Sequence, residues 1–253
     1  MYIYKFKDMF FDVIDVTLDF LYPENISCIL CNSAISTKNT YSMCKDCFSE
    51  MQFILDGCAK CGKPIVNYSL EEQSIENCSY CINKKFYFDR AISCIEYSNK
   101  SKDIVFKFKY NNKTYIGKYI AKIMKEKLLM ENIDVDYILF VPLHKARLNK
   151  RGFNQAKKIA IYLSKLIDIP IVDNIKRVNN TKRLYKLNRN KRKDELKNAF
   201  LIDEDKCDLK GKNVLIVDDI FTTGSTVNEI SKLLRMKLVN KIYIITLITG
   251  SYE

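Results

Sequence analysis

Residues 214–226 constrain the fold of this chain more than any other stretch of its sequence. Four aliphatic residues, Val214 to Val217, are followed by Asp218 and Asp219, and a hydroxyl-rich turn then leads into a predicted helix from Val227 to about Met236. An uninterrupted aliphatic run of this kind is typical of a buried strand in a parallel sheet. A strand, a turn and a helix in this order predict an α/β fold.

The residues at the end of this strand predict a site for a sugar phosphate, because ligands of open α/β sheets bind at the carboxyl ends of the strands. The turn offers backbone N–H groups, hydroxyl donors and the positive end of a helix dipole, roughly half a charge, which together suit a phosphate. The carboxylates of Asp218 and Asp219 suit the vicinal hydroxyls of a sugar, directly or through a metal ion. The predicted phosphate-binding residues are Thr222, Thr223, Gly224, Ser225 and Thr226.

This segment resembles the phosphoribosyl-pyrophosphate (PRPP) motif of type I phosphoribosyltransferases over thirteen contiguous residues. An ordinary strand–turn–helix of another α/β fold, with solvated acids, is the alternative. Competing nucleotide motifs are missing, since the seven glycines form neither G-x-x-x-x-G-K-[ST] nor G-x-G-x-x-G. The single histidine, His144, excludes an H-E-x-x-H zinc site.

Eight of the ten cysteines form four C-x-x-C pairs within residues 28–81. Two thiolates at this spacing can bind one ion from a tight turn, with each sulfur about 2.3 Å from zinc. Four pairs therefore predict two tetrahedral zinc sites without an open coordination position, which makes both of them structural. The predicted ligands are Cys28, Cys31, Cys44, Cys47, Cys58, Cys61, Cys78 and Cys81.

The sequence leaves open which two C-x-x-C pairs bind the same zinc ion. The first two pairs can close one site, because a turn after Pro23 would meet the start of a helix predicted from Cys47 to Leu55, and the last two pairs would form the other. A cross-braced arrangement, with pairs one and three together and pairs two and four together, is the alternative. Redox dithiols, a disulfide framework and an iron–sulfur cluster are the competing interpretations. Four pairs in one short run, in a chain without a recognisable signal peptide, favour zinc in a reducing cytosol.

The net charge of +12 favours polyanionic partners such as phosphates, nucleic acid or an anionic membrane face. No apolar run reaches the roughly 18 residues of a membrane span, so none is predicted. We expect a cytoplasmic protein, with the inner face of the membrane as a second location. The predicted domains are an amphipathic helix at residues 1–21, a cysteine-rich double zinc module at 22–85 and an α/β domain at 86–253.

Basic residues occur in three further places. Lys145, Arg147 and Arg151 follow a second predicted buried strand, and guanidinium groups there would suit a pyrophosphate, with a solvated loop as the alternative. Residues 176–197 carry ten Lys or Arg, which predicts a flap over a phosphorylated ligand, a track for single-stranded nucleic acid or a solvated face. The lysines within Phe106–Tyr110 are interpreted as solvent-facing, with one lysine reaching a phosphate as the weaker alternative.

The order of these motifs, including Lys109-Tyr110 and the R-G-F-N-Q-A string at 151–156, resembles the ComF (late competence) family over about residues 15–250. The resemblance implies a type I phosphoribosyltransferase-like parallel sheet flanked by helices, behind a small N-terminal zinc-binding module. It also implies Mg²⁺ with PRPP, and a role in bringing single-stranded DNA across the inner membrane in natural transformation, together with a helicase and an uptake channel. The family's phosphoribosyl acceptor is not defined. Departures from the family pattern occur at Leu184, Asn188 and Glu195, where members have Gln, Ser and Asn.

The leading hypothesis is therefore a ComF-like competence protein that binds PRPP and Mg²⁺ and assists the uptake of single-stranded DNA. The alternatives are a nucleobase-salvage phosphoribosyltransferase unconnected with DNA, and a catalytically inactive module that binds single-stranded DNA. If the site catalyses transfer, pyrophosphate would leave the anomeric carbon through an oxocarbenium-like state, which is stabilised mainly by positioning and charge. No residue of the sequence stands out as a catalytic base.

Overall fold

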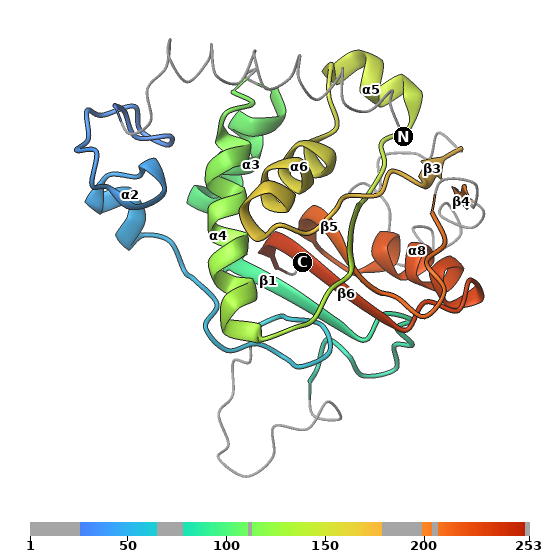
Figure 1. Cartoon of the computed structure of the whole chain (residues 1–253). Helices are drawn as coiled ribbons and strands as arrows, with labels where there is room; N and C mark the ends of the chain where they lie inside the picture. The colour runs from blue at the N-terminus through green and yellow to red at the C-terminus, as the bar shows by residue number, and fades with distance from the viewer. Residues whose placement is uncertain (1–25, 65–77, 111–112, 179–198, 204–206, 251–253) are drawn as a thin grey trace. The chain divides into compact units, whose positions relative to one another are not determined.

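The computed structural model describes residues 26–64, 78–110, 113–178, 199–203 and 207–250 (Figure 1). The chain divides into two compact units, Met1–Glu50 and Met51–Glu253. The predicted N-terminal helix at 1–21 lies outside the described residues, as does most of the basic stretch at 176–197.

The described part of the first unit contains a short 3-10 helix, η1 (Thr40–Ser42), and the helix α2 (Lys45–Ser49). α2 begins after Cys44, whose sulfur accepts a hydrogen bond from the backbone N–H of Cys47 at 3.4 Å. The prediction of a helix continuing to Leu55 is wrong, because the chain beyond residue 50 is extended. There, in the second unit, Phe53 forms an antiparallel bridge with Ile95. The backbone groups of this segment therefore hydrogen-bond to the edge strand β1 and not within a helix.

A four-stranded parallel sheet forms the centre of the second unit, with the strand order β1-β6-β5-β2. Its strands are β1 (Arg90–Glu96), β2 (Tyr137–Phe140), β5 (Asn213–Phe221) and β6 (Lys241–Thr249). The aliphatic residues 214–217 of β5 are fully buried, as expected for a strand covered on both faces. The prediction of a parallel α/β sheet is confirmed.

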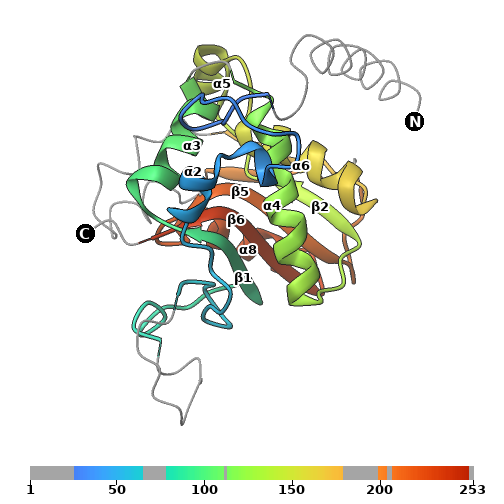
Figure 2. The same ribbon diagram turned by 90° about the vertical axis from the view of Figure 1, so that its left-hand side faces the viewer.

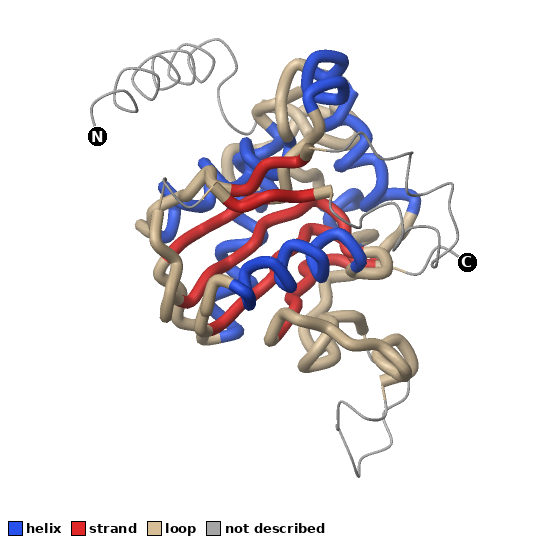
Figure 3. The backbone as a smooth tube through the Cα atoms, turned by 90° about the vertical axis from the view of Figure 1, so that its right-hand side faces the viewer, coloured by secondary structure: helices blue, strands red, loops and turns tan. Residues whose placement is uncertain are grey.

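Helices cover both faces of this sheet (Figures 1 and 2). α4 (Ile116–Glu131) and α6 (Gln155–Ile167) lie on one face, with α3 (Asn99–Tyr110) beside α4, and α8 (Ser225–Met236) lies on the other face (Figure 3). α8 buries Val227, Ile230, Ser231 and Leu234, which is the spacing of one helical face.

Three short elements complete the second unit. α5 (Lys145–Arg151) connects β2 to α6, and β3 (Ile175–Arg177) pairs with β4 (Phe200–Ile202) in a small antiparallel sheet. In the sequence, residues 179–198, which are outside the described residues, separate β3 from β4.

Candidate functional site

The two acids lie inside β5, because this strand continues past its predicted end at Val217. Pairing with β6 places Asp218 opposite Thr246 and continues to Phe221. The strand on the other side of β5 ends earlier, since the last residue of β2, Phe140, pairs with Val217. β2 therefore stops where the acids begin, at the carboxyl-terminal rim of the sheet.

The turn after β5 requires a glycine where α8 begins. Gly224 has a φ of 74°, and a Cβ at this position would lie 2.6 Å from Cζ of Phe221, so only glycine fits without displacing the ring. Gly224 is also the N-cap residue of α8 and supplies no side-chain cap. The hydroxyls of Thr223 and Ser225 lie 2.8 Å apart and share a hydrogen bond. Helix N–H groups and hydroxyls therefore converge in this turn.

Burial and the neighbouring Asp219 perturb the ionisation of Asp218. The backbone N–H of Asp219 donates to Oδ1 of Asp218 at 2.9 Å. Burial raises the pKa of the Asp218 carboxyl to about 7, the charge of Asp219 adds to this effect, and Lys109 and Arg177 oppose it. Removal from water and a neighbouring like charge both disfavour the ionised form. A cation bound beside these acids would relieve both effects.

The three predicted pyrophosphate residues all lie on α5 and differ in their surroundings. Lys145 is exposed and Arg147 is half-buried. Arg151 donates to Oε1 of Gln155 at 2.8 Å and to the hydroxyl of Tyr110 at 3.2 Å, and its guanidinium carbon lies 5.2 Å from the Tyr110 ring centroid. Arg151 is thus hydrogen-bonded to residues of α3 and α6, whereas Lys145 is exposed to solvent.

The R-G-F-N-Q-A string orients α5 relative to the sheet. Gly152, with a φ of 81°, ends α5, and Phe153 packs edge-on against Phe108 with ring centroids 5.5 Å apart. Asn154 caps α6 by accepting the N–H of Lys157, and its Nδ2 donates to the carbonyl of Val141 at 3.0 Å. The string therefore connects α5 and α6 to the end of β2.

Two basic residues near the acids were not predicted as site residues. Lys109, at the end of α3, forms an ion pair with Asp219 in which Nζ and Oδ2 are 2.6 Å apart. Arg177 lies over the Phe200 ring at 5.3 Å, and burial lowers its pKa to about 10, with Arg147 adding to this effect and Asp218 opposing it. The sequence signal that could have pointed to Lys109 was its place in the Lys109-Tyr110 pair. Its contact with Asp219 could not be predicted locally, because the two residues are 110 positions apart in the chain.

The cysteines form two clusters, and the pairing is sequential. Cys28, Cys31, Cys44 and Cys47 form one cluster and Cys58, Cys61, Cys78 and Cys81 the other, with the four sulfurs of each within 4.8 Å of one another. Neighbouring sulfurs lie 3.6 Å apart in the first cluster and 3.7 and 3.8 Å apart in the second. A tetrahedral ion with bonds of about 2.3 Å requires sulfurs about 3.8 Å apart, so both clusters fit zinc.

The second cysteine cluster is attached to the sheet. The N–H of Ala91 in β1 donates to the carbonyl of Lys60 at 2.9 Å, and a Cβ on Gly62 would lie 2.4 Å from the carbonyl oxygen of Ala91. Lys63 is only 3% exposed, and its Nζ donates to the carbonyl of Gly250, after β6, at 2.9 Å. Zinc with four thiolates carries two net negative charges, which this buried ammonium partly offsets.

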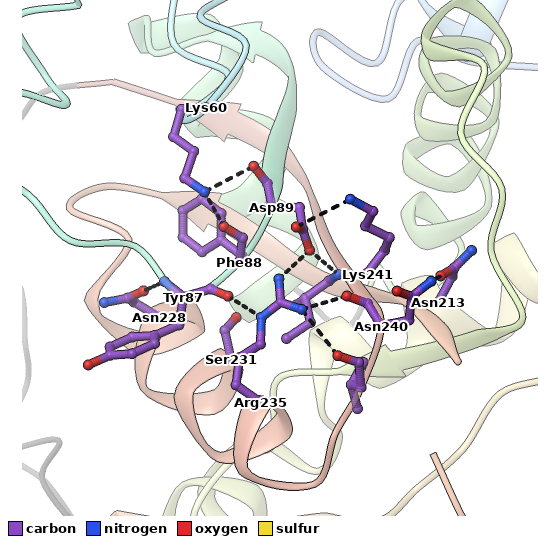
Figure 4. Close-up of polar contacts among 12 residues, drawn as sticks. Lys60, Tyr87, Phe88, Asp89, Asn213, Asn228, Ser231, Arg235, Asn240 and Lys241 are labelled. Carbon is purple, nitrogen blue, oxygen red and sulfur yellow. Dashed lines mark hydrogen bonds and ion pairs between the residues drawn. The ribbon is translucent and has the colours of Figure 1, made fainter. Parts of the chain in front are cut away.

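The segment that leads from the second cluster into β1 is bound to α8 and β6 by a polar network (Figure 4). Arg235 of α8 donates to the carbonyl of Tyr87 at 2.9 Å and forms an ion pair with Asp89. The same Asp89 carboxylate accepts the N–H of Ile242 at 2.7 Å, and Asn228 accepts the N–H of Tyr87 at 2.6 Å. These contacts connect the segment after the second cluster to α8, the helix that follows the turn at residues 222–226.

Comparison with known families defines the class of protein. The double zinc ribbon domain family matches residues 17–82, and the phosphoribosyl transferase domain family matches residues 148–252. Among solved structures, a similar one is an adenine phosphoribosyltransferase, at 15% identity and a TM-score of 0.38, covering 56% of this chain and 74% of that one. The parallel sheet and the family match together define a phosphoribosyltransferase-like α/β domain that is preceded by zinc ribbons.

Curated relatives specify the family. The chain is 30% identical over 226 residues to Competence protein F of Haemophilus influenzae, covering 87% of this chain and 95% of the relative. It is 30% identical to the DNA utilization protein YhgH of Salmonella typhimurium, with coverages of 82% and 89%. It is 25% identical to Competence protein ComFC of Bacillus subtilis, with coverages of 83% and 89%. This chain belongs to the ComF family of competence proteins, and its two cysteine clusters are structural zinc sites of the zinc ribbon type.

A membrane-crossing segment was not predicted from the sequence. In the ranges that the structure describes, none of the helices combines the length and the apolar character that crossing a membrane requires.

Proposed function

We propose that this ComF-family protein binds PRPP together with Mg²⁺ at the carboxyl-terminal rim of β5 and works in the uptake of single-stranded DNA during natural transformation. One observation carries the first part of this proposal. Paired acids near the end of β5 and the N-terminus of α8, which has no side-chain cap, are separated only by residues 220–224. A ribose 5-phosphate presents vicinal hydroxyls and a phosphate, the two kinds of group that suit the acids and the helix N-terminus.

The assignment of groups follows from their chemistry. Asp218 and Asp219 bind the ribose hydroxyls directly or through Mg²⁺, which prefers carboxylate oxygens and keeps part of its water shell. Residues 222–226 bind the 5′-phosphate through backbone N–H groups and hydroxyls. Lys145, Arg147 and Arg151 bind the pyrophosphate. The raised pKa of Asp218 supports the metal, because a cation returns this carboxyl to its ionised form.

Phosphoribosyl transfer is the reaction that such a site supports. The two acids would orient the ribose and so fix the anomeric carbon, and the basic residues of α5 would stabilise the charge that develops on the departing pyrophosphate. Pyrophosphate release, measured with and without nucleobases or DNA, would identify an acceptor.

Replacing both acids by asparagine should weaken PRPP binding in the presence of Mg²⁺ by at least about tenfold, since each change removes a charged ligand oxygen. Isothermal titration calorimetry of the full chain measures this. Asp168→Asn is the matched control, because Asp168 is an exposed C-cap residue of α6 in a left-handed conformation that asparagine tolerates. Undetectable binding by the unmodified protein, or equal binding by the double variant, would contradict the assignment.

The DNA part of the proposal is supported by the net charge of +12 and by relatives named for competence and DNA utilization. Affinity for a labelled single-stranded oligonucleotide should fall steeply with salt. Neutralising four residues of the basic stretch should lower the slope of log K against log salt by about 3. The four are Arg189, Lys191, Arg192 and Lys193, all outside the described residues.

The matched control neutralises four lysines elsewhere, Lys122, Lys125, Lys165 and Lys210, which removes the same charge without touching the basic stretch. Fluorescence anisotropy over a salt series gives both slopes. Equal slopes for the two quadruple variants would reject the basic stretch as the DNA-binding segment. A deletion strain separates the remaining alternatives, because loss of transformation indicates DNA uptake and loss of growth on a nucleobase indicates salvage.

A further inference from the structure

Lys109 lies directly beside Asp219, one of the two acids proposed to bind the ribose hydroxyls or Mg²⁺. Its Nζ lies 2.6 Å from Oδ2 of Asp219, and the two side chains are only 17% and 13% exposed. Lys109 also stabilises the charged form of Asp218. In the ligand-free protein, this lysine therefore supplies counter-charge to both acids. A metal ion or a ribose hydroxyl that binds Asp219 must compete for the same oxygen.

The end of α3 contacts both halves of the proposed site. Lys109 pairs with the acid half, and the next residue, Tyr110, accepts a hydrogen bond from Arg151 in the basic half at 3.2 Å. The backbone here is well anchored, because Phe108 is fully buried and packs against Phe153. The Lys109 side chain, by contrast, is a flexible four-carbon stem with a compact charge. It can leave Asp219 without moving the helix, and the basic half of the site lies beside it.

We propose that Lys109 is an exchangeable counter-cation: it pairs with Asp219 when the site is free, and contacts the pyrophosphate group when Mg²⁺ and PRPP occupy the acids. This inference rests on the proposed function and adds a residue and an exchange of partners to it. It explains why a lysine is placed against an acid that is needed for binding. In the free protein, Lys109 offsets the charge of the acids. In the bound protein, its released ammonium offsets charge on the pyrophosphate.

The exchange predicts opposite effects of Lys109→Met on two ligands. Affinity for Mn²⁺ alone, a probe for the Mg²⁺ position, should increase about tenfold because a close positive charge is gone. Affinity for PRPP in the presence of Mg²⁺ should decrease about tenfold because a phosphate contact is lost. Electron paramagnetic resonance of free Mn²⁺ measures the first and calorimetry the second, and neither depends on catalytic activity.

Two further variants sharpen the test. Lys107→Met removes a lysine from the same helix and should leave both affinities unchanged, whereas Lys109→Arg keeps the charge and should stay near the unmodified protein in the Mn²⁺ measurement. A parallel fall in both affinities with Lys109→Met would assign Lys109 a merely structural role and overturn the exchange. Unchanged Mn²⁺ affinity would overturn it as well. If the unmodified protein does not bind PRPP at all, the proposed function fails, and the Mn²⁺ measurement still reports on the Lys109–Asp219 pair.

Discussion

Replacing Cys58 or Cys81 by serine is expected to destabilise the phosphoribosyltransferase-like unit, whereas the same change at Cys28 or Cys44 should leave that unit folded. The second cluster belongs to the compact unit that contains the sheet, and the first cluster belongs to the other unit. Zinc binding to four thiolates is worth on the order of 10 kcal/mol in small zinc domains, which is comparable to the whole stability of a typical domain.

Backbone hydrogen bonds connect the second zinc site to the sheet, so loss of the ion would destabilise the sheet. Ile54 donates to the carbonyl of Cys94 and Ala91 donates to that of Lys60, so the loop carrying Cys58 and Cys61 lies along the edge strand β1. Loss of the ion would release this loop and expose the β1 edge together with the buried Lys63.

Thermal unfolding followed by circular dichroism, with zinc content measured in parallel, tests whether the second cluster stabilises the sheet more than the first. Cys207→Ser is the control, because Cys207 lies outside both clusters and is partly exposed. Equal losses of the melting temperature for the two clusters, at equal zinc loss, would show that the second ion is not part of the sheet's stability.

Asp218→Asn should make the ligand-free protein more stable at pH 8 while it weakens binding. The pKa of the Asp218 carboxyl is raised from its ordinary 3.8 to about 7, mainly by burial. Folding therefore favours the protonated form, so the stability that this carboxyl contributes is present at low pH and is lost as the pH rises between these two values. At about 1.4 kcal/mol per pKa unit, a shift of this size corresponds to at most about 4 kcal/mol.

Asparagine keeps the acceptor oxygen for the N–H of Asp219 and does not ionise. The stability difference between the variant and the unmodified protein should therefore grow from about pH 5 to about pH 8. Urea unfolding at both pH values measures it, with Asp168→Asn as the control that should show no such growth. A variant that is less stable at pH 8, or a difference that does not change with pH, would contradict the assigned pKa shift.

The raised pKa of Asp218 means that its charged form is unfavourable in the free protein. If the proposed cation binds beside this carboxylate, relief of that unfavourable charge would contribute to the binding free energy. Lys109 limits the cost in the free state by pairing with the neighbouring Asp219.

The features that sequence alone determined are those encoded by neighbouring residues. The aliphatic run of β5, the glycine of the turn at residues 222–226 and the helix α8 each depend on local backbone geometry, so their positions followed directly from the order of residues. The C-x-x-C spacing likewise identified the zinc ligands, because two cysteines separated by two residues can bind one ion from a tight turn.

Tertiary structure alone decided the rest, and the reason is distance along the chain. Residues 51–56 extend along β1 because the edge of a sheet offered partners that a helical pattern cannot reveal. The two pairings of cysteine pairs were equally compatible with their spacing until the folded chain brought neighbours together. Lys109 meets Asp219 only because parallel strands, joined through helices, bring the end of α3 to the carboxyl-terminal rim of β5. Such contacts depend on the sum of all packing interactions, which no local pattern contains.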